Sequence, residues 1–155
     1  FGKRSTLFRL AHGYYANRQN TIVCDFKYAR FEKNEQKFDL QLWDSAGQER
    51  FRTLPTIYIR SAVMIIIIID LSNAKTTERL DEHFTYIEQF ADPGAIIVMV
   101  GNKLDLVDEP THGKEIADEY GIDYFEISAV EGTGFAEFEN YLRERVYAKW
   151  ENQGL

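Results

Sequence analysis

The sequence predicts a single α/β domain with a mostly parallel central sheet and helices on both faces. Apolar runs alternate with segments of helical periodicity, which is typical of β-α-β units around a parallel sheet. Residues 63–69 are almost all β-branched, as expected for a strand in the middle of a sheet that is covered on both sides. The length of 155 residues fits one domain, which we assign to residues 1–155.

The apolar pattern predicts five strands. Two of them, joined by a short polar link at residues 32–35, are expected to form an antiparallel hairpin at one side of the sheet. The other three are apolar runs that alternate with the predicted helices. The predicted strands cover residues 21–29, 37–43, 63–69, 95–100 and 124–127.

Helical periodicity predicts four helices. In the three longer segments, apolar side chains recur at steps of three and four residues. Pro93 lies just beyond the first of these segments and Gly121 directly follows the second, and both residues are helix stop signals. The predicted helices cover residues 5–11, 76–90, 113–120 and 135–150.

Composition and charge narrow the function classes. The net charge is −7, from 25 acidic and 18 basic residues with no basic stripe, so we expect no nucleic-acid partner. Cys24 is the single cysteine, which excludes an internal disulfide and favours a reducing, cytoplasmic location. The longest apolar run has eight residues at 62–69, whereas a membrane-spanning helix needs about 20. The sequence ends at Leu155 without a terminal cysteine, so we expect membrane attachment only through a lipidated tail that this chain lacks.

Polar residues follow three of the predicted strands. Asp44 follows one strand, Asn102 follows a second after a glycine, and Ser128 follows a third. In an open α/β sheet, ligands bind outside the carboxyl ends of the strands. We therefore expect these residues on one rim of the sheet.

The segment from Asp44 to Gln48 has the layout of a phosphate sensor. Asp44 can hold Mg²⁺, which neutralises charge on the β- and γ-phosphates. The N–H of Gly47 can donate to a γ-phosphate oxygen, and Gln48 can align an attacking water. An Asp-x-x-Gly pattern alone is common in turns, but here it directly follows an apolar strand at residues 38–43.

The segment Asn102-Lys103-Leu104-Asp105 fits the recognition of a guanine base. The carboxylate of Asp105 can accept from N1–H and the 2-amino group of guanine, and adenine offers neither donor. Asn102 can bond N7, and the stem of Lys103 can lie over the ring. Ser128 and Ala129 can offer a backbone N–H to the guanine O6. The alternative interpretation of the four-residue segment is a surface turn.

The first residues resemble the end of a phosphate-binding loop, G-x-x-x-x-G-K-[ST], at Gly2 and Lys3. Arg4 occupies the position where a metal-binding hydroxyl is expected, and Ser5 can serve instead only if the loop shifts. Thr21 can add a hydroxyl to the metal shell and an N–H to the γ-phosphate. The alternatives are an ordinary exposed lysine at Lys3 and a strand-initiating threonine at Thr21.

With these residues in place, the chain resembles the Rab family within the Ras superfamily of small GTPases. The similarity runs from Gly2 to Trp150. Residues 43–51 resemble the second switch of the family, and residues 39–43 resemble the segment that leads into it. Residues 21–26 resemble the end of the first switch, and residues 58–62 resemble a Tyr-Tyr-Arg-Gly-Ala element. The aromatic residues that match the effector-binding trio of this family are Phe26, Trp43 and Tyr58.

The resemblance implies a P-loop NTPase, or small G-domain, fold in which the first strand is missing from this chain. It also implies binding of GTP and GDP with Mg²⁺, slow GTP hydrolysis and a switch role in vesicle traffic. Effectors, an exchange factor and a GTPase-activating protein are then expected at the switch regions, and the full-length form on the cytosolic face of endomembranes. Because Arg4 departs from the family pattern and most of the phosphate loop is missing from this chain, the alternative is a non-hydrolysing, Rab-like binding module with a defective phosphate loop.

Overall fold

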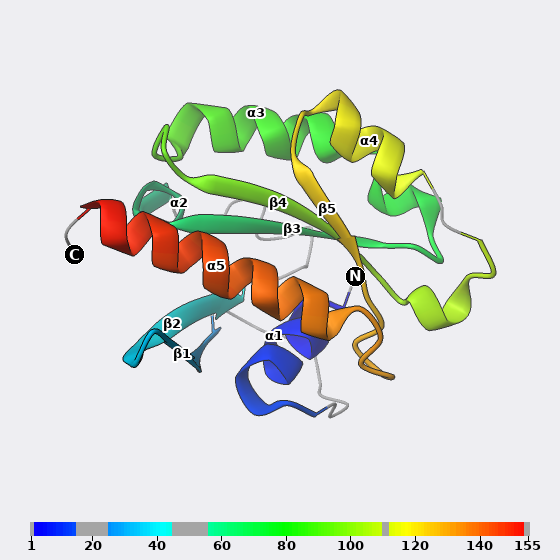
Figure 1. Ribbon diagram of the computed structural model, residues 1–155. Helices are drawn as coiled ribbons and strands as arrows, with labels where there is room; N and C mark the ends of the chain where they lie inside the picture. Colours follow the sequence, from blue (N-terminus) through cyan, green and yellow to red (C-terminus); the bar gives the residue numbers. More distant parts are fainter. Residues whose placement is uncertain (1, 15–24, 45–55, 110–111, 154–155) are drawn as a thin grey trace.

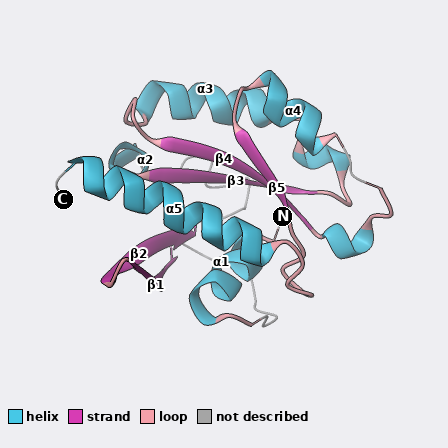
Figure 2. Cartoon of the chain, in the orientation of Figure 1, coloured by secondary structure: helices cyan, strands magenta, loops and turns pink. Residues whose placement is uncertain are grey.

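The computed structural model describes residues 2–14, 25–44, 56–109 and 112–153. This part of the chain contains five strands and five α-helices, and Figures 1 and 2 show their arrangement. Two short 3₁₀ helices lie at Ala74–Thr76 and Leu104–Leu106. The other elements are α1 (Lys3–His12), β1 (Asp25–Lys33), β2 (Gln36–Asp44), α2 (Thr56–Ser61), β3 (Met64–Asp70), α3 (Leu80–Phe90), β4 (Ile96–Asn102), α4 (Gly113–Glu119), β5 (Asp123–Glu126) and α5 (Phe135–Gln153).

Strands β3, β4 and β5 form a parallel sheet in that order. β4 is the central strand, and Val98, Met99 and Val100 on it are fully buried. Within the described residues β3 is an edge strand of this sheet, so its predicted central position is wrong there. Most of the side chains of β3 are only half-buried, because a strand pairs with β3 on one side alone in this part of the chain.

Strands β1 and β2 form the predicted antiparallel hairpin, with partners running from Asp25 and Asp44 to Lys33 and Gln36. The link is shorter than predicted: Asn34 and Glu35 alone turn the chain, both with positive φ, at 49° and 63°. This backbone matches a two-residue hairpin turn, whose twist suits the flanking strands and extends both of them. The first four residues of the predicted strand at 21–29 lie outside the described residues.

The predicted position of the hairpin at one side of the parallel sheet is wrong within the described residues. There β1 and β2 pair only with each other, as a separate two-stranded sheet. Neighbouring strands of one sheet lie about 4.8 Å apart and share a hydrogen-bond ladder, and none of the described residues forms a ladder between β2 and β3. Figure 1 shows the hairpin below the three parallel strands, near α1 and α5.

Helices cover both faces of the parallel sheet, as predicted (Figure 1). The alternation of side chains along β4 explains the two layers. On one face Val98 and Val100 belong to the same apolar cluster as Phe138 and Leu142 of α5 and Leu7 of α1. On the other face Met99 belongs to a second cluster, which includes residues of α3 and α4.

The helix predicted at 76–90 begins later than expected, at Leu80. The side chain of Asn73 accepts from the N–H of Lys75 at 3.1 Å, and the hydroxyl of Thr77 donates to the carbonyl of Ala74 at 2.7 Å. Such local side-chain bonds stabilise a tight turn in competition with an α-helix. Helix α2 was not predicted, since six residues are too few to show helical periodicity. No helix in the described part of the chain is long and apolar enough to cross a bilayer.

Candidate functional site

The three parallel strands end at one rim. Asp70 ends β3 and lies in register with Asn102, which ends β4, and Ser128 follows β5 by two residues. Asn102 and Ser128 therefore share a rim, as the sequence predicts. Asp70 was not predicted there, although it follows the apolar run of β3 as the first polar residue, which is the pattern that singled out Asp44.

Asn102 connects two loops of this rim. Its side chain is 2% exposed, and its Oδ1 accepts from the N–H of Ala129 at 3.0 Å. The amide nitrogen of the Asn102 side chain lies next to Gly2, whose φ of 77° is in the left-handed region. A Cβ at Gly2 would overlap Nδ2 of Asn102, so the close approach requires glycine. The predicted phosphate-loop residue and the predicted base loop thus meet at one buried amide.

Asp105 is held by the loop that follows β5. Its Oδ1 accepts from the hydroxyl of Ser128 at 2.6 Å, and the same hydroxyl oxygen accepts from the N–H of Glu131 at 3.0 Å. Ser128 is fully buried, whereas Asp105 is exposed. Because an ionised carboxylate offers about four lone-pair sites, Asp105 keeps the capacity to accept from a ligand.

The backbone donors of Ser128 and Ala129 are engaged within the protein. The N–H of Ser128 donates to the carbonyl of Thr133 at 3.0 Å, and the N–H of Ala129 donates to Asn102. Both donors of this pair therefore already have acceptors within the protein, in Asn102 and Thr133, and their contact with guanine O6 stays a prediction. Base reading by Asp105 stays a prediction.

Lys103 forms an ion pair with the buried Asp70, with 2.5 Å between Nζ and Oδ2. The hydroxyl and the N–H of Ser72 donate to Oδ1 of the same carboxylate, at 2.6 and 3.0 Å. Burial raises the pKa of Asp70, but the bonds from Lys103 and Ser72 outweigh it and hold the pKa below its ordinary value. The ammonium group of Lys103 is thus held at the end of β3, and the aliphatic part of the Lys103 side chain lies at the rim.

Replacing Lys103 with methionine is expected to destabilise the protein at neutral pH by about 1–3 kcal/mol, since a buried carboxylate loses its charged partner. A carboxyl with a lowered folded-state pKa contributes stability above its unfolded pKa, and that stability is lost as the pH falls through the folded value. The difference between wild type and Lys103→Met should therefore shrink below about pH 4. Urea unfolding of both proteins from neutral to acid pH measures this difference in the free energy of unfolding.

Lys114→Met is the matched control, because the ion pair of Lys114 with Asp118 is exposed at the surface of α4. An exposed pair of this kind contributes about 0–1 kcal/mol, so the control should change little with pH. A loss of stability in Lys103→Met that stays constant down to acid pH would contradict the coupling to Asp70.

Arg9 is a second residue that the sequence analysis missed. Its Nε donates to the carbonyl of Ala129 at 2.7 Å, and one of its terminal nitrogens donates to the carbonyl of Val130 at 2.8 Å. A side chain of α1 therefore fixes the loop after β5. No local signal could have found it, since the partners are 120 residues apart in sequence.

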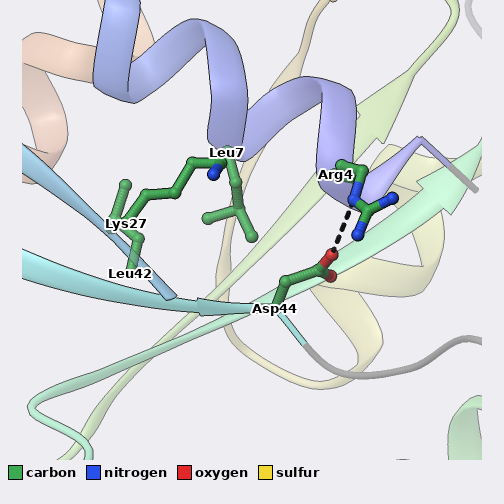
Figure 3. Close-up of a pocket in the computed structure, with 5 residues that line it drawn as sticks. All are labelled: Arg4, Leu7, Lys27, Leu42 and Asp44. Carbon is green, nitrogen blue, oxygen red and sulfur yellow. Dashed lines mark ion pairs between the residues drawn. The ribbon is translucent and has the colours of Figure 1, made fainter. Parts of the chain in front are cut away.

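The first turn of α1 lies between the rim and the end of β2. Burial lowers the pKa of Lys3, and the charge of Asp44 offsets part of this effect. Asp44 is 6% exposed, and its Oδ2 lies 3.9 Å from Nε of Arg4 (Figure 3). Ser5 is half-buried on the next position of α1, where helical geometry turns it about 100° from Arg4. Asp44 therefore ends a strand of the separate hairpin and not of the parallel sheet, and Lys3 and Arg4 relate it to the first turn of α1.

The residues around Asp44 do not fit the magnesium ion that the sequence predicts. Mg²⁺ requires six oxygen ligands in near-ideal octahedral geometry. Here the guanidinium of Arg4, a cation that offers no lone pair, lies 3.9 Å from the carboxylate. No group of three or more histidine, cysteine, aspartate or glutamate side chains that could hold a metal occurs among the described residues. The predicted second ligand, Thr21, lies outside them, as do Gly47 and Gln48.

The aromatic residues Phe26, Trp43 and Tyr58 come together as one surface. Ring centroids of Phe26 and Trp43 lie 5.0 Å apart, and those of Trp43 and Tyr58 lie 4.5 Å apart. Phe26 is 44% exposed and Trp43 is 37% exposed. Large exposed aromatic rings in contact with one another are typical of protein interaction sites. We call these three residues the aromatic surface.

Comparison with known proteins identifies the family. The family model described as "Ras family" matches residues 1–147. The chain is 36% identical over 133 residues to "Ras-related protein Rab-3A" of Homo sapiens, a match that covers 83% of this chain. It is 37% identical over 135 residues to "Ras-related protein Rab-3B" of Bos taurus, with 84% of this chain covered. The matches cover 60% and 62% of these two relatives. Since the family model spans almost the whole chain, this protein belongs to the Ras family, as its Rab-like motifs predict.

Proposed function

We propose that this protein binds GTP and GDP as a Rab-like switch and hydrolyses GTP slowly. The observation that carries the proposal is the buried Asn102, which lies between Gly2 and Ala129 at the carboxyl ends of the parallel strands. One side chain then couples the loop that would hold phosphate to the loop that would hold the base. Membership of the Ras family supports the same conclusion.

Base recognition is assigned to Asp105, with Asn102 and Lys103 beside it. The bond from Ser128 holds the Asp105 carboxylate, which can then accept from a ring that offers two neighbouring donors. Guanine presents such donors and adenine does not, so a site built around this carboxylate favours GTP over ATP. Lys103, tied to Asp70, supports the ring face with its stem.

Phosphate binding is assigned to Gly2, Lys3 and the start of α1. The left-handed backbone of Gly2 places it before the first turn of a ten-residue helix, whose free N–H groups favour an anion. Lys3 and Arg4 add positive charge on the same turn. Ser5 keeps a minor role as a hydroxyl donor near this turn.

The proposed reaction is GTP and water giving GDP and phosphate. Gln48 aligns the attacking water, and the N–H groups of Gly47 and Thr21 contact the γ-phosphate; these roles rest on the family resemblance. The Mg²⁺ predicted at Asp44 and Thr21 stays a prediction that the geometry around Arg4 opposes, and no step is assigned to it. Most of the rate enhancement at such sites comes from positioning and charge stabilisation, so the unaided rate is slow.

The cellular role is proposed from the family. The aromatic surface of Phe26, Trp43 and Tyr58 would bind effectors, while an exchange factor and a GTPase-activating protein would act at the switch regions. Vesicle traffic is the process, and the cytosolic face of endomembranes is the location, reached through a lipidated tail.

A second candidate is a binding module that holds guanine nucleotide without turning it over. The position of Arg4 beside Asp44 favours it, because a guanidinium there replaces the usual metal ligand set. Single-turnover hydrolysis of GTP separates the two candidates. Release of phosphate above the rate in buffer supports the enzyme, and bound GTP that persists unchanged supports the module.

Replacing Gln48 with leucine is expected to lower single-turnover GTP hydrolysis at least about tenfold while GTP affinity stays unchanged. The amide that aligns the water is lost, but no contact to the base or the sugar changes. Phosphate release measures the rate and calorimetry measures the affinity. Gln153→Leu, at the exposed end of α5, is the control. Unchanged turnover in Gln48→Leu would remove Gln48 from the water-positioning role.

A further inference from the structure

The carboxylate of Asp44 lies among cationic side chains. Nε of Arg4 is 3.9 Å from its Oδ2, and the two side chains are 25% and 8% exposed. Figure 3 shows the guanidinium reaching from the first turn of α1 to the end of β2, where the carboxylate points back at it. This contact joins the predicted phosphate end of the site to the predicted metal ligand.

Two further cations act on the same region. Burial lowers the pKa of Lys3, and the charge of Asp44 offsets part of this effect, so the ammonium group of Lys3 interacts electrostatically with the carboxylate. Lys27 of β1 lines the same small pocket as Arg4 and Asp44. Arg4 and Lys3 therefore act on the carboxylate of Asp44 directly, and Lys27 adds a third positive side chain to the walls of the pocket.

Such a region repels a divalent cation and leaves it little room. The pocket of Arg4, Leu7, Lys27, Leu42 and Asp44 has a volume of about 10 Å³, which is space for about one water molecule (Figure 3). Its remaining walls, Leu7 and Leu42, carry no side-chain oxygen. A magnesium ion that needs six oxygen ligands would have to displace Arg4 first.

We propose that the guanidinium of Arg4 takes the place of the divalent cation at Asp44, so that the chain binds guanine nucleotide independently of Mg²⁺. A guanidinium has five N–H donors in a planar fork, and it can face a carboxylate on one edge and phosphate oxygens on another. It carries a single fixed charge and does not dissociate from the protein. The inference rests on the proposed function, since it requires a guanine nucleotide in the site.

The test measures the affinity of GDP by calorimetry in EDTA and in millimolar MgCl₂. The wild-type dissociation constant should differ by less than about twofold between the two buffers. In Arg4→Ser, which provides a hydroxyl in place of the guanidinium, GDP should bind at least about tenfold more tightly with Mg²⁺ than with EDTA. Arg4→Lys retains a cation and should remain independent of Mg²⁺.

The matched control is Arg145→Ser on α5. Arg145 and Asp123 form an ion pair with the same separation of 3.9 Å, but both side chains are about half-exposed, and Asp123 begins β5 at the opposite end of the strand from the rim. This variant should behave as the wild type in both buffers.

Electron paramagnetic resonance of Mn²⁺ gives a second readout that does not depend on activity. The wild type with GDP should leave Mn²⁺ free in solution, whereas Arg4→Ser with GDP should bind about one ion. The inference is overturned if Mg²⁺ tightens wild-type GDP binding tenfold or more, or if the wild type binds Mn²⁺ stoichiometrically. Absence of GDP binding to the wild type in both buffers overturns the proposed function itself, and the inference with it. The wild-type measurements decide the outcome even if Arg4→Ser does not fold.

Discussion

Replacing Asn102 with alanine is expected to lower the free energy of unfolding by about 1–3 kcal/mol and to abolish measurable GDP binding. The substitution removes the acceptor for the N–H of Ala129 in a position that is 2% exposed. A buried donor then stays unsatisfied, which is the costly part of losing a hydrogen bond. It also opens a gap against Gly2, so the phosphate and base loops lose their common support. Urea unfolding and calorimetric titration with GDP measure the two effects.

Asn73→Ala is the control for this substitution. Asn73 also accepts a backbone hydrogen bond, from the N–H of Lys75, but it is exposed and remote from the rim. Removing the Asn73 side chain should lower the free energy of unfolding only by part of a capping interaction, and GDP affinity should stay unchanged. If Asn102→Ala bound GDP as tightly as the wild type, the joint role of this side chain in the two loops would be wrong.

Replacing Gly134 with alanine is expected to destabilise the protein by more than about 2 kcal/mol. Gly134 has a φ of 74°, and an added Cβ would overlap the carbonyl oxygen of Glu126 and lie 3.4 Å from Cα of Ile127. These are backbone atoms at the end of β5, so no side chain can move aside. Relief of the overlap would separate the start of α5 from β5, where the loop that holds Asp105 begins. Thermal unfolding measures the stability, and GDP affinity should fall with it.

Gly121→Ala separates backbone strain from steric overlap. Gly121 has a similar φ of 65°, but an added Cβ would meet no atom within 4 Å. Gly121→Ala should lower the free energy of unfolding only by the strain of alanine in the left-handed conformation, about 1–2 kcal/mol. Equal destabilisation by the two variants would show that the overlap with Glu126 contributes nothing.

The sequence predicted the parallel strands because a buried strand leaves a simple signal. The apolar run before Asn102 is fully buried at its centre, and in a domain of this size such a run fits only inside the sheet. The hairpin was predicted from its short polar link, but its exact turn was not, since Asn34 and Glu35 adopt positive φ without a glycine. The late start of α3 depends on side-chain bonds of Asn73 and Thr77, which helical periodicity does not report.

Residues of the candidate site could be predicted where a polar side chain of suitable chemistry follows an apolar strand in the sequence. Asn102, Asp105 and Ser128 were singled out in this way, and hydrogen bonds connect the loops that carry them, while their roles toward a nucleotide stay predictions. The contacts that tie the site together were not predictable, because they join distant parts of the chain. The anchoring of the last loop by Arg9, the pair of Lys103 with Asp70, and the approach of Arg4 to Asp44 are all of this kind.

The proposed base specificity is the central claim, and calorimetric titration of the wild-type protein with GDP and ATP tests it most directly. We expect GDP to bind at one site and ATP to bind at least about a hundredfold more weakly, because Asp105 finds no pair of donors on adenine. The titration is made in EDTA and repeated with MgCl₂, so that the result does not depend on the role of Arg4. Equal affinities for GDP and ATP, or no binding of GDP at high micromolar concentration in either buffer, would contradict the account.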